Sequence, residues 1–269
     1  MRGPAHPLAE VLDAAGDGVF PDPDGTVRIL GQPNARDCGV IAFTAHTLVF
    51  ADVDPAWARG LLPEDDLSAP LNPPFLGALE ERTGRRVNNV DMLMVAGPLP
   101  GPPPVPLVEI VDRAHPRVRR ALRHRDGVRV WRADGGIVML GRGVAGRWEI
   151  AVEVDPGHRG RGLGAALARA GRHLLGAGEG EEPAEAPGVG HGAGSGVGRV
   201  EEPGAGRGEE PGGGRSAGRR EARVVWAQIA PGNAASVRAF LAAGFTPVGA
   251  EALFLPPPPS GQAASPSGR

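Results

Sequence analysis

Two kinds of apolar periodicity follow one another in the second half of the chain. Over Arg147–Val154, apolar side chains occupy every second position, which is the period of a β-strand with one buried face. From Leu163 to Leu174, apolar residues recur instead at intervals of three and four, the spacing of an amphipathic helix. The pattern therefore predicts a strand and a helix joined by the short segment between them.

The same patterns predict further elements on both sides of this pair. Before it, strands are expected at Val105–Val111, Val128–Arg132 and Gly136–Gly141, and a helix at Pro116–Arg125. After it, we expect a strand at Arg223–Ile229, a helix that Asn233 caps and Gly244 ends, and one or two strands in Phe245–Phe254. In the first hundred residues, helices are expected at Leu8–Ala15 and Pro74–Arg85, and strands at Thr26–Leu30, Val40–Phe43, Thr47–Asp52 and Val90–Ala96. This alternation is typical of the α/β class.

Proline and glycine divide the chain into segments. Residues Gly97–Pro106 read GPLPGPPPVP, and proline lacks the N–H that a helix or a sheet needs. We therefore predict a linker at residues 98–104, between a small α/β N-terminal lobe at residues 1–97 and a second domain at residues 105–255. Residues 176–222 have almost no large apolar side chains, so a disordered insert is expected there, and a disordered tail is expected at residues 256–269.

Composition excludes several classes of function. A formal net charge of −2 argues against a nucleic-acid partner. The single cysteine, Cys38, cannot form an internal disulfide, and no histidines or cysteines have metal-ligand spacing, so we expect a reducing compartment and no metal. No apolar run is long enough to span a membrane, and the first residues lack the core of a signal peptide. These features predict a cytoplasmic protein without membrane or nucleic-acid partners.

The segment between the strand and the helix, Asp155–Ala165, carries the strongest chemical signal. Glycines at 160, 162 and 164 let a backbone approach a ligand closely, and the free N–H groups of a helix N-terminus favour an anion. Arg159 and Arg161 add positive charge suited to phosphate. The same glycines could instead serve close packing of helix on strand. A dinucleotide site is disfavoured, because its fingerprint needs a second strand with an acidic residue about 20 residues later, and the expected disordered insert occupies that position.

The strand ending in Val154-Asp155-Pro156, followed by Arg-x-x-Gly-x-Gly and an apolar helix, resembles the acetyl-CoA-binding motif of the GCN5-related N-acetyltransferases. A second motif, Asn233 to Gly244-Phe245, resembles that family's Asn-capped helix followed by Gly-Phe and a strand. The resemblance covers roughly residues 105–255, apart from the insert. It implies an acetyltransferase fold with a mixed sheet in this domain, and acetyl-CoA as cosubstrate.

The resemblance also implies the cofactor-binding residues. CoA pyrophosphate would lie on the turn backbone, the pantetheine arm would pair along the end of the strand, and a backbone N–H near its end would polarise the thioester carbonyl. The Asn233 side chain would hydrogen-bond the pantetheine or the acetyl end. The alternative is that Asn233 serves only as the N-cap of its helix. The implied residues are Val152, Glu153, Val154, Arg159, Gly160, Arg161, Gly162, Leu163, Gly164, Ala165 and Asn233.

The proton-transfer groups depart from the family pattern. The chain has no tyrosine, and Phe240 stands where that helix usually offers one as the acid. Gln228 stands where some ribosomal-protein acetyltransferases of the family carry a catalytic Glu, and an amide cannot act as a base. We therefore predict Glu149 as a base acting through water. The alternative is that Glu149 is a solvated carboxylate on the strand face.

The predicted function is transfer of an acetyl group from acetyl-CoA to a primary amine of a small molecule or a protein N-terminus. A non-catalytic acyl-CoA-binding or regulatory module is the alternative, because of the missing tyrosine and the Gln at 228. In a third interpretation, the first lobe binds a partner and the transferase is auxiliary. The sequence does not identify the acceptor or the oligomeric state.

Overall fold

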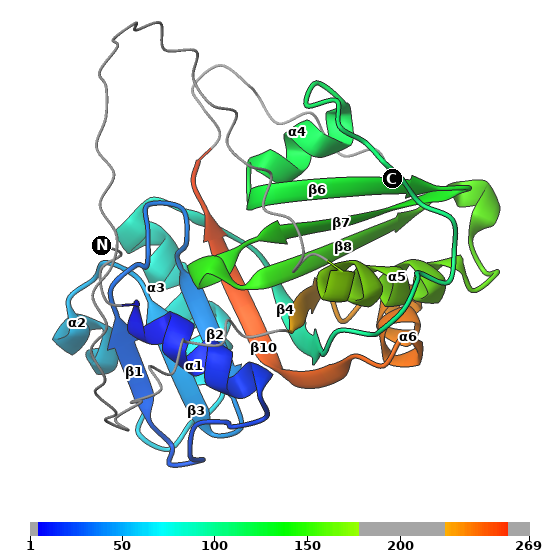
Figure 1. The fold of residues 1–269 in the computed structure, drawn as a ribbon. Helices are drawn as coiled ribbons and strands as arrows, with labels where there is room; N and C mark the ends of the chain where they lie inside the picture. The colour runs from blue at the N-terminus through cyan, green and yellow to red at the C-terminus, as the bar shows by residue number, and fades with distance from the viewer. Residues whose placement is uncertain (1–4, 178–223, 258–269) are drawn as a thin grey trace, which may run out of the picture.

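The computed structural model describes residues 5–177 and 224–257, which form one ten-stranded mixed sheet flanked by helices (Figure 1). The helices are α1 (Pro7–Gly16), α2 (Pro55–Gly60), α3 (Pro73–Thr83), α4 (Pro116–Leu122), α5 (Leu163–Ala177) and α6 (Ala234–Ala242). The strands are β1 (Val27–Leu30), β2 (Gly39–Phe43), β3 (His46–Phe50), β4 (Arg86–Ala96), β5 (Val108–Glu109), β6 (Asp126–Ala133), β7 (Gly136–Arg142), β8 (Trp148–Val154), β9 (Val225–Ile229) and β10 (Thr246–Leu255).

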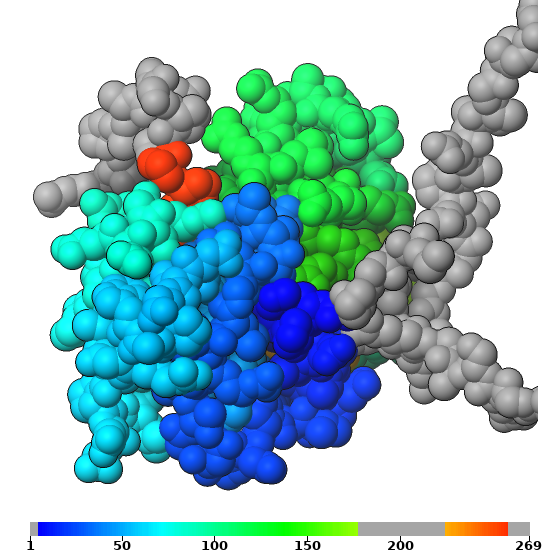
Figure 2. Space-filling view, turned by 90° about the vertical axis from the view of Figure 1, so that its left-hand side faces the viewer, coloured from blue at the N-terminus to red at the C-terminus, as the bar shows by residue number. Residues whose placement is uncertain are grey.

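Strand order places segments from both ends of the chain side by side. The order is β1-β3-β2-β10-β4-β9-β8-β7-β6-β5, so β10 lies between β2 and β4, and β4 lies between β10 and β9. In Figure 1, β10 runs between the blue and cyan N-terminal elements and the green elements. Figure 2 shows its red end at the surface between the same two groups. Hydrogen-bonded pairing therefore continues across the predicted linker, and the division into a lobe and a domain stays a prediction.

Each face of the sheet is covered by helices that bury apolar side chains. On one face, α1 buries Leu8 and Leu12 against β2 and β3. On the same face, α4 packs against β6. On the other face, α5 and α6 cover β7, β8 and β9, while α3 packs against β2 and β10. Leu167 of α5 and Phe240 of α6 are the largest buried side chains of these two helices. The apolar faces of these helices and of the sheet thus form three clusters of buried side chains.

Most predicted elements are present, with differences at their ends and one additional helix; the strand expected at Val90–Ala96, for example, already begins at Arg86. The strand expected at Val105–Val111 is reduced to β5, in a segment rich in proline. The helix expected at Pro116–Arg125 ends at Leu122. Helix α2 was not expected, although Asp54 caps it by accepting from the Trp57 amide at 2.7 Å and Pro55 begins it. The expected insert lies almost entirely outside the described residues, as does the tail beyond Pro257.

Candidate functional site

The sheet opens between its parallel neighbours β8 and β9. Their register contains only Trp148↔Val225 and Glu149↔Trp226, whereas β8 continues to Val154 and β9 to Ile229. Beyond Glu149, β8 therefore pairs with β7 alone, and its other edge faces a gap. The carboxyl ends of parallel strands are the usual place for a ligand in an α/β sheet.

The Gly-rich turn leads from β8 into α5 at this same end. Gly160 has φ of 75° and Gly162 has φ of 82°, a left-handed conformation that strains other residues, and an added Cβ at either would meet nothing within 4 Å. The first helical bond runs from the Ala166 amide to the Gly162 carbonyl at 3.1 Å. The backbone N–H groups of residues 160–165 have no acceptor among the described residues. A turn with several free N–H groups beside a 15-residue helix suits an anion.

The predicted cofactor-binding residues fall into three structural situations. Val152, Glu153 and Val154 form the unpaired edge of β8, and the Arg159 Nε donates to the Val154 carbonyl at 3.2 Å. Residues 160–163 form the open turn. Gly164 differs, because a Cβ there would lie 3.4 Å from the Cβ of Ala239 on α6. The third glycine therefore allows α5 and α6 to pack closely, which is the alternative interpretation for that position.

Asn233 caps α6, as the sequence predicted. Its side-chain oxygen accepts from the Ser236 amide at 3.1 Å, and the residue is exposed at the end of β9. The cap role is thus present in the structure. A contact with pantetheine stays a prediction.

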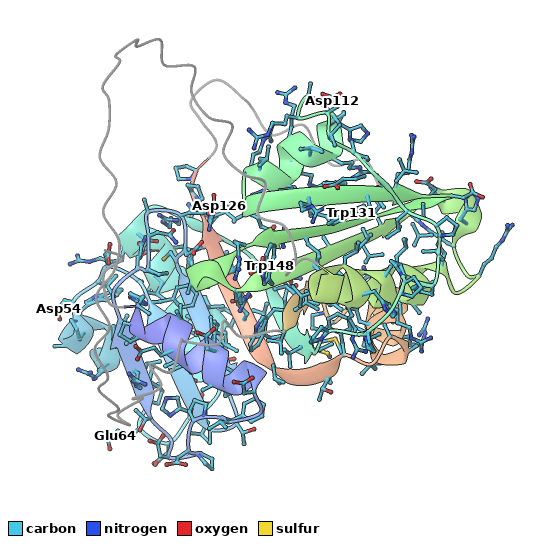
Figure 3. All side chains as sticks on the ribbon, in the orientation of Figure 1. Asp54, Glu64, Asp112, Asp126, Trp131 and Trp148 are labelled. Carbon is cyan, nitrogen blue, oxygen red and sulfur yellow. The ribbon has the colours of Figure 1, made fainter. Side chains whose placement is uncertain are left out.

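A cavity of about 530 Å³ lies on the face of the sheet that α4 covers. Ala151, Val152 and Glu153 of β8 and Gln228 of β9 line it, so it reaches the gap between the two strands. Its remaining walls come from α4 and its following turn, from β4 and β7, from the end of β10 and from residues 36–38. The N-terminal segment therefore contributes side chains to the same cavity as the C-terminal one. Arg36 also joins Asp126 at 3.0 Å, and Figure 3 labels Asp126 where β6 approaches the N-terminal elements.

A hydrogen-bonded network of polar side chains adjoins this cavity: Arg125, Glu149 and Gln228 line it, and Arg147 and Glu251 bond to them from outside the lining. We call Arg125, Arg147, Glu149, Gln228 and Glu251 the floor cluster. Arg125 and Arg147 donate to Glu149 at 2.8 and 3.0 Å, and Arg147 also donates to Glu251 at 2.7 Å. Gln228 donates to Glu251 at 2.6 Å. The five residues come from four places in the chain, because Arg147 and Glu149 both lie at the start of β8.

Glu149 is 3% exposed, so the alternative of a solvated strand carboxylate is wrong. The face of β8 that carries it is covered, because Glu149 accepts from the Val144 amide in the turn after β7 at 3.2 Å and from Arg125, which follows α4, at 2.8 Å. Burial alone would raise its pKa, but Arg147, Arg125 and the Val144 amide outweigh burial and hold the pKa of Glu149 below its ordinary value. Glu251 lies deeper, and burial raises its pKa despite Arg147.

Comparison with solved structures shows one similarity. A GCN5-related N-acetyltransferase from Kribbella flavida is similar to this chain with a TM-score of 0.35 and 16% sequence identity. The match covers 67% of this chain and 63% of the other. No protein-family model matches the sequence, and no curated protein matches it. The function is accordingly inferred from the geometry of the site.

Within residues 5–177 and 224–257, no three His, Cys, Asp or Glu side chains gather as metal ligands would. None of the described helices is both long and apolar enough to cross a membrane. Phe240, where the family offers a tyrosine, is buried and packs edge-on against Phe245, with ring centroids 4.9 Å apart.

Sequence reasoning missed the cavity residues that precede position 98. Asp91 on β4 lines the cavity together with Arg36 and Asp37. A signal was present, since Asn88, Asn89 and Asp91 interrupt an otherwise apolar strand. Its meaning depends on which strand β4 pairs with, and local patterns do not determine that.

Proposed function

We propose that the protein is an acyltransferase that moves an acetyl group from acetyl-CoA to an amine. The observation that carries the proposal is the coincidence, at one end of β8, of an unpaired strand edge and a turn of free N–H groups. An extended thioester arm that ends in a pyrophosphate needs both features in that order. The cavity on the face of the sheet that α4 covers also reaches the gap, so the acceptor would enter there, separately from CoA.

Each part of the chain would have a definite task in this reaction. The backbone of Val152–Val154 would pair with the pantetheine arm, as an additional strand would. The N–H groups from Gly160 to Ala165 would bind the pyrophosphate, with Arg159 and Arg161 adding charge. A β8 backbone N–H facing the gap would stabilise the oxyanion that forms when the amine attacks.

Glu149 is better suited to positioning than to accepting a proton. Two guanidinium groups stabilise its ionised form and lower its pKa, which weakens it as a base near neutral pH. Its carboxylate fixes Arg125 and Arg147 and accepts from Gln228 at 3.3 Å. We therefore propose that Glu149 holds the cavity floor in place, which revises its predicted role as base.

Gly162→Val tests the phosphate site. A β-branched side chain at positive φ would stand in the open space where phosphate oxygens are expected, so CoA affinity should fall about tenfold or more. Gly18→Val is a matched control, because Gly18 also has φ of 82° and an added Cβ there meets nothing within 4 Å. Calorimetric titration with CoA should show weakening for Gly162→Val alone. Equal affinities for the two variants would exclude this turn.

A non-catalytic acyl-CoA-binding module is the second candidate. Phe240 offers no acid for the leaving thiolate, and its ring lies in an apolar core. The two candidates differ in turnover: an acyltransferase releases CoA from acetyl-CoA when an amine is present, and a binding module does not. Release of free thiol, measured at saturating acetyl-CoA with and without an amine, separates them.

A further inference from the structure

Most charged side chains around the cavity already have partners of opposite sign. Arg36 is paired with Asp37 at 2.9 Å, and Arg117 is paired with Glu153. Arg125 and Glu149 belong to the floor cluster. Such pairs satisfy one another and leave little charge for a ligand.

Asp91 is the exception among the carboxylates that line the cavity. Its recorded partner is the Asn89 Nδ2 at 2.9 Å, and no arginine among the described residues forms an ion pair with it. The side chain is partly buried. Burial is the largest influence on this carboxyl and raises its pKa, with the Asn89 bond opposing. A carboxylate in that situation favours a cation that reaches it.

Sheet register places Asp91 near the gap. Asp91 is opposite Glu251 on β10, and Leu93, two residues along the same face, is opposite Gln228 on β9. Asp91 therefore shares the cavity face with Gln228, on the strand next to β9, and neighbouring strands lie about 4.8 Å apart. Asp91, Gln228 and residues 151–153 of β8 line one cavity, so an amine held by Asp91 lies in the space that reaches the gap.

The wall across from β4 is mixed. Ala121 of α4, Val130 of β6, and Ile137 and Met139 of β7 give it an apolar part, and Arg117, Arg120, His124 and Arg125 also line the cavity from α4 and the turn that follows it. A ligand with a cationic nitrogen at Asp91 and an apolar stem against the four apolar side chains fits the part of the lining that β4, β6 and β7 form.

We propose that this cavity binds a primary amine on an apolar stem, and that Asp91 is the residue that binds its ammonium group and accepts its proton. Binding stands on the cavity alone, while the transfer step rests on the proposed function. Asp91 takes one proton from R–NH₃⁺, and the neutral nitrogen attacks the thioester carbonyl carbon and forms the C–N bond. The C–S bond then breaks, and the thiolate receives the second proton of the nitrogen. The products are the amide and CoA thiol, and Asp91 releases its proton to water.

Binding of phenethylamine to the full-length protein tests the proposal. Calorimetry should show that the wild type binds this amine near neutral pH and that Asp91→Asn binds it about tenfold more weakly or worse, because a charge-assisted hydrogen bond is lost. Asp65→Asn, an exposed aspartate, is the matched control and should bind as the wild type does. Met139→Trp should also weaken amine binding by filling the cavity from the opposite wall.

Folding and CoA affinity are measured on the same samples. Because the pKa of Asp91 is raised, ionising it costs more in the folded than in the unfolded chain, so Asp91→Asn should melt at an unchanged or higher temperature. CoA affinity should be unchanged in Asp91→Asn. If the wild type does not bind CoA, the proposed function fails, and this outcome is distinguishable from a failure of amine binding. Absence of amine binding by the wild type, or equal binding by Asp91→Asn, would overturn the proposal.

Discussion

Two buried carboxylates and one buried guanidinium lie together in the floor cluster. Taking these groups out of water costs several kcal/mol each, and their mutual attraction offsets the cost only while the set is complete. Arg147 is central, because its guanidinium donates to both Glu149 and Glu251. The same guanidinium lies over the Trp226 ring, 5.3 Å from the ring centroid. Loss of one member therefore leaves a buried charge without its partner.

Arg147→Met should destabilise the fold by about 3–5 kcal/mol, because Glu251 then has no cation beside it. Urea denaturation would measure the loss. Arg59→Met, at an exposed position, is the control and should change stability by less than about 0.5 kcal/mol. The double variant Arg147→Met with Glu251→Leu should recover part of the stability, since it removes the isolated charge as well. A single variant as stable as the wild type would contradict this account of the cluster.

Glu149→Gln should reduce stability and activity together, and the loss of activity should not diminish as pH rises above neutral. A base would behave differently, since high pH supplies neutral amine without it. The depressed pKa of Glu149 means that its ion pairs stabilise the fold above its unfolded pKa and are lost as pH falls through the folded pKa. Acid denaturation should therefore depend less on pH in Glu149→Gln. Activity that recovers fully at high pH would restore Glu149 as the base.

At the scale of elements, the sequence predicts individual strands and helices better than their neighbours. The alternation in β8 and the cap of α6 are local, so they are readable from a few residues. That β4 pairs with β9 and β10 depends on the whole sheet, and no local pattern contains it. The turn at residues 160–162 was predictable because its two glycines are only two positions apart in sequence. Asp91 was not, because the cavity joins it to residues far along the chain.

Close approach of β10 to β2 gives a prediction for one glycine. A Cβ added at Gly249 would lie 2.3 Å from the Ala42 carbonyl oxygen, and this backbone atom cannot rotate away. Gly249→Ala should therefore destabilise the fold by about 1–3 kcal/mol, as overpacking does. Gly60→Ala has open space around the new methyl group and should be neutral. Thermal melting of both variants, compared with the wild type, would show whether the two strands approach this closely.

At the scale of the whole molecule, the sheet makes the two halves of the sequence interdependent. β4 supplies a neighbour to both β9 and β10, and β10 supplies one to β2. The cavity likewise takes walls from both halves. A chain that began after the predicted linker would expose the unpaired edges of β9 and β10, and exposed edges favour aggregation.

Residues 98–269 expressed alone should therefore fail to unfold cooperatively, whereas co-expression with residues 1–97 should restore a soluble complex that binds CoA. Circular dichroism on heating and co-purification of the two fragments would measure this. A cooperative transition in residues 98–269 alone would show that this part folds without β4, and would support the predicted division at the linker.

The central place of β10 also has a consequence for biosynthesis. β4 ends at Ala96, yet β10, one of its two neighbours, begins only at Thr246. At roughly 5–20 residues per second, the ribosome needs on the order of ten seconds or more to make the intervening chain. Throughout that time β2 and β4 have no partner for the edges that later meet β10, so the nascent chain is open to pairing with other chains. The sheet is complete only after residues 246–255 have been made, when β10 inserts between two strands that were synthesised well before it.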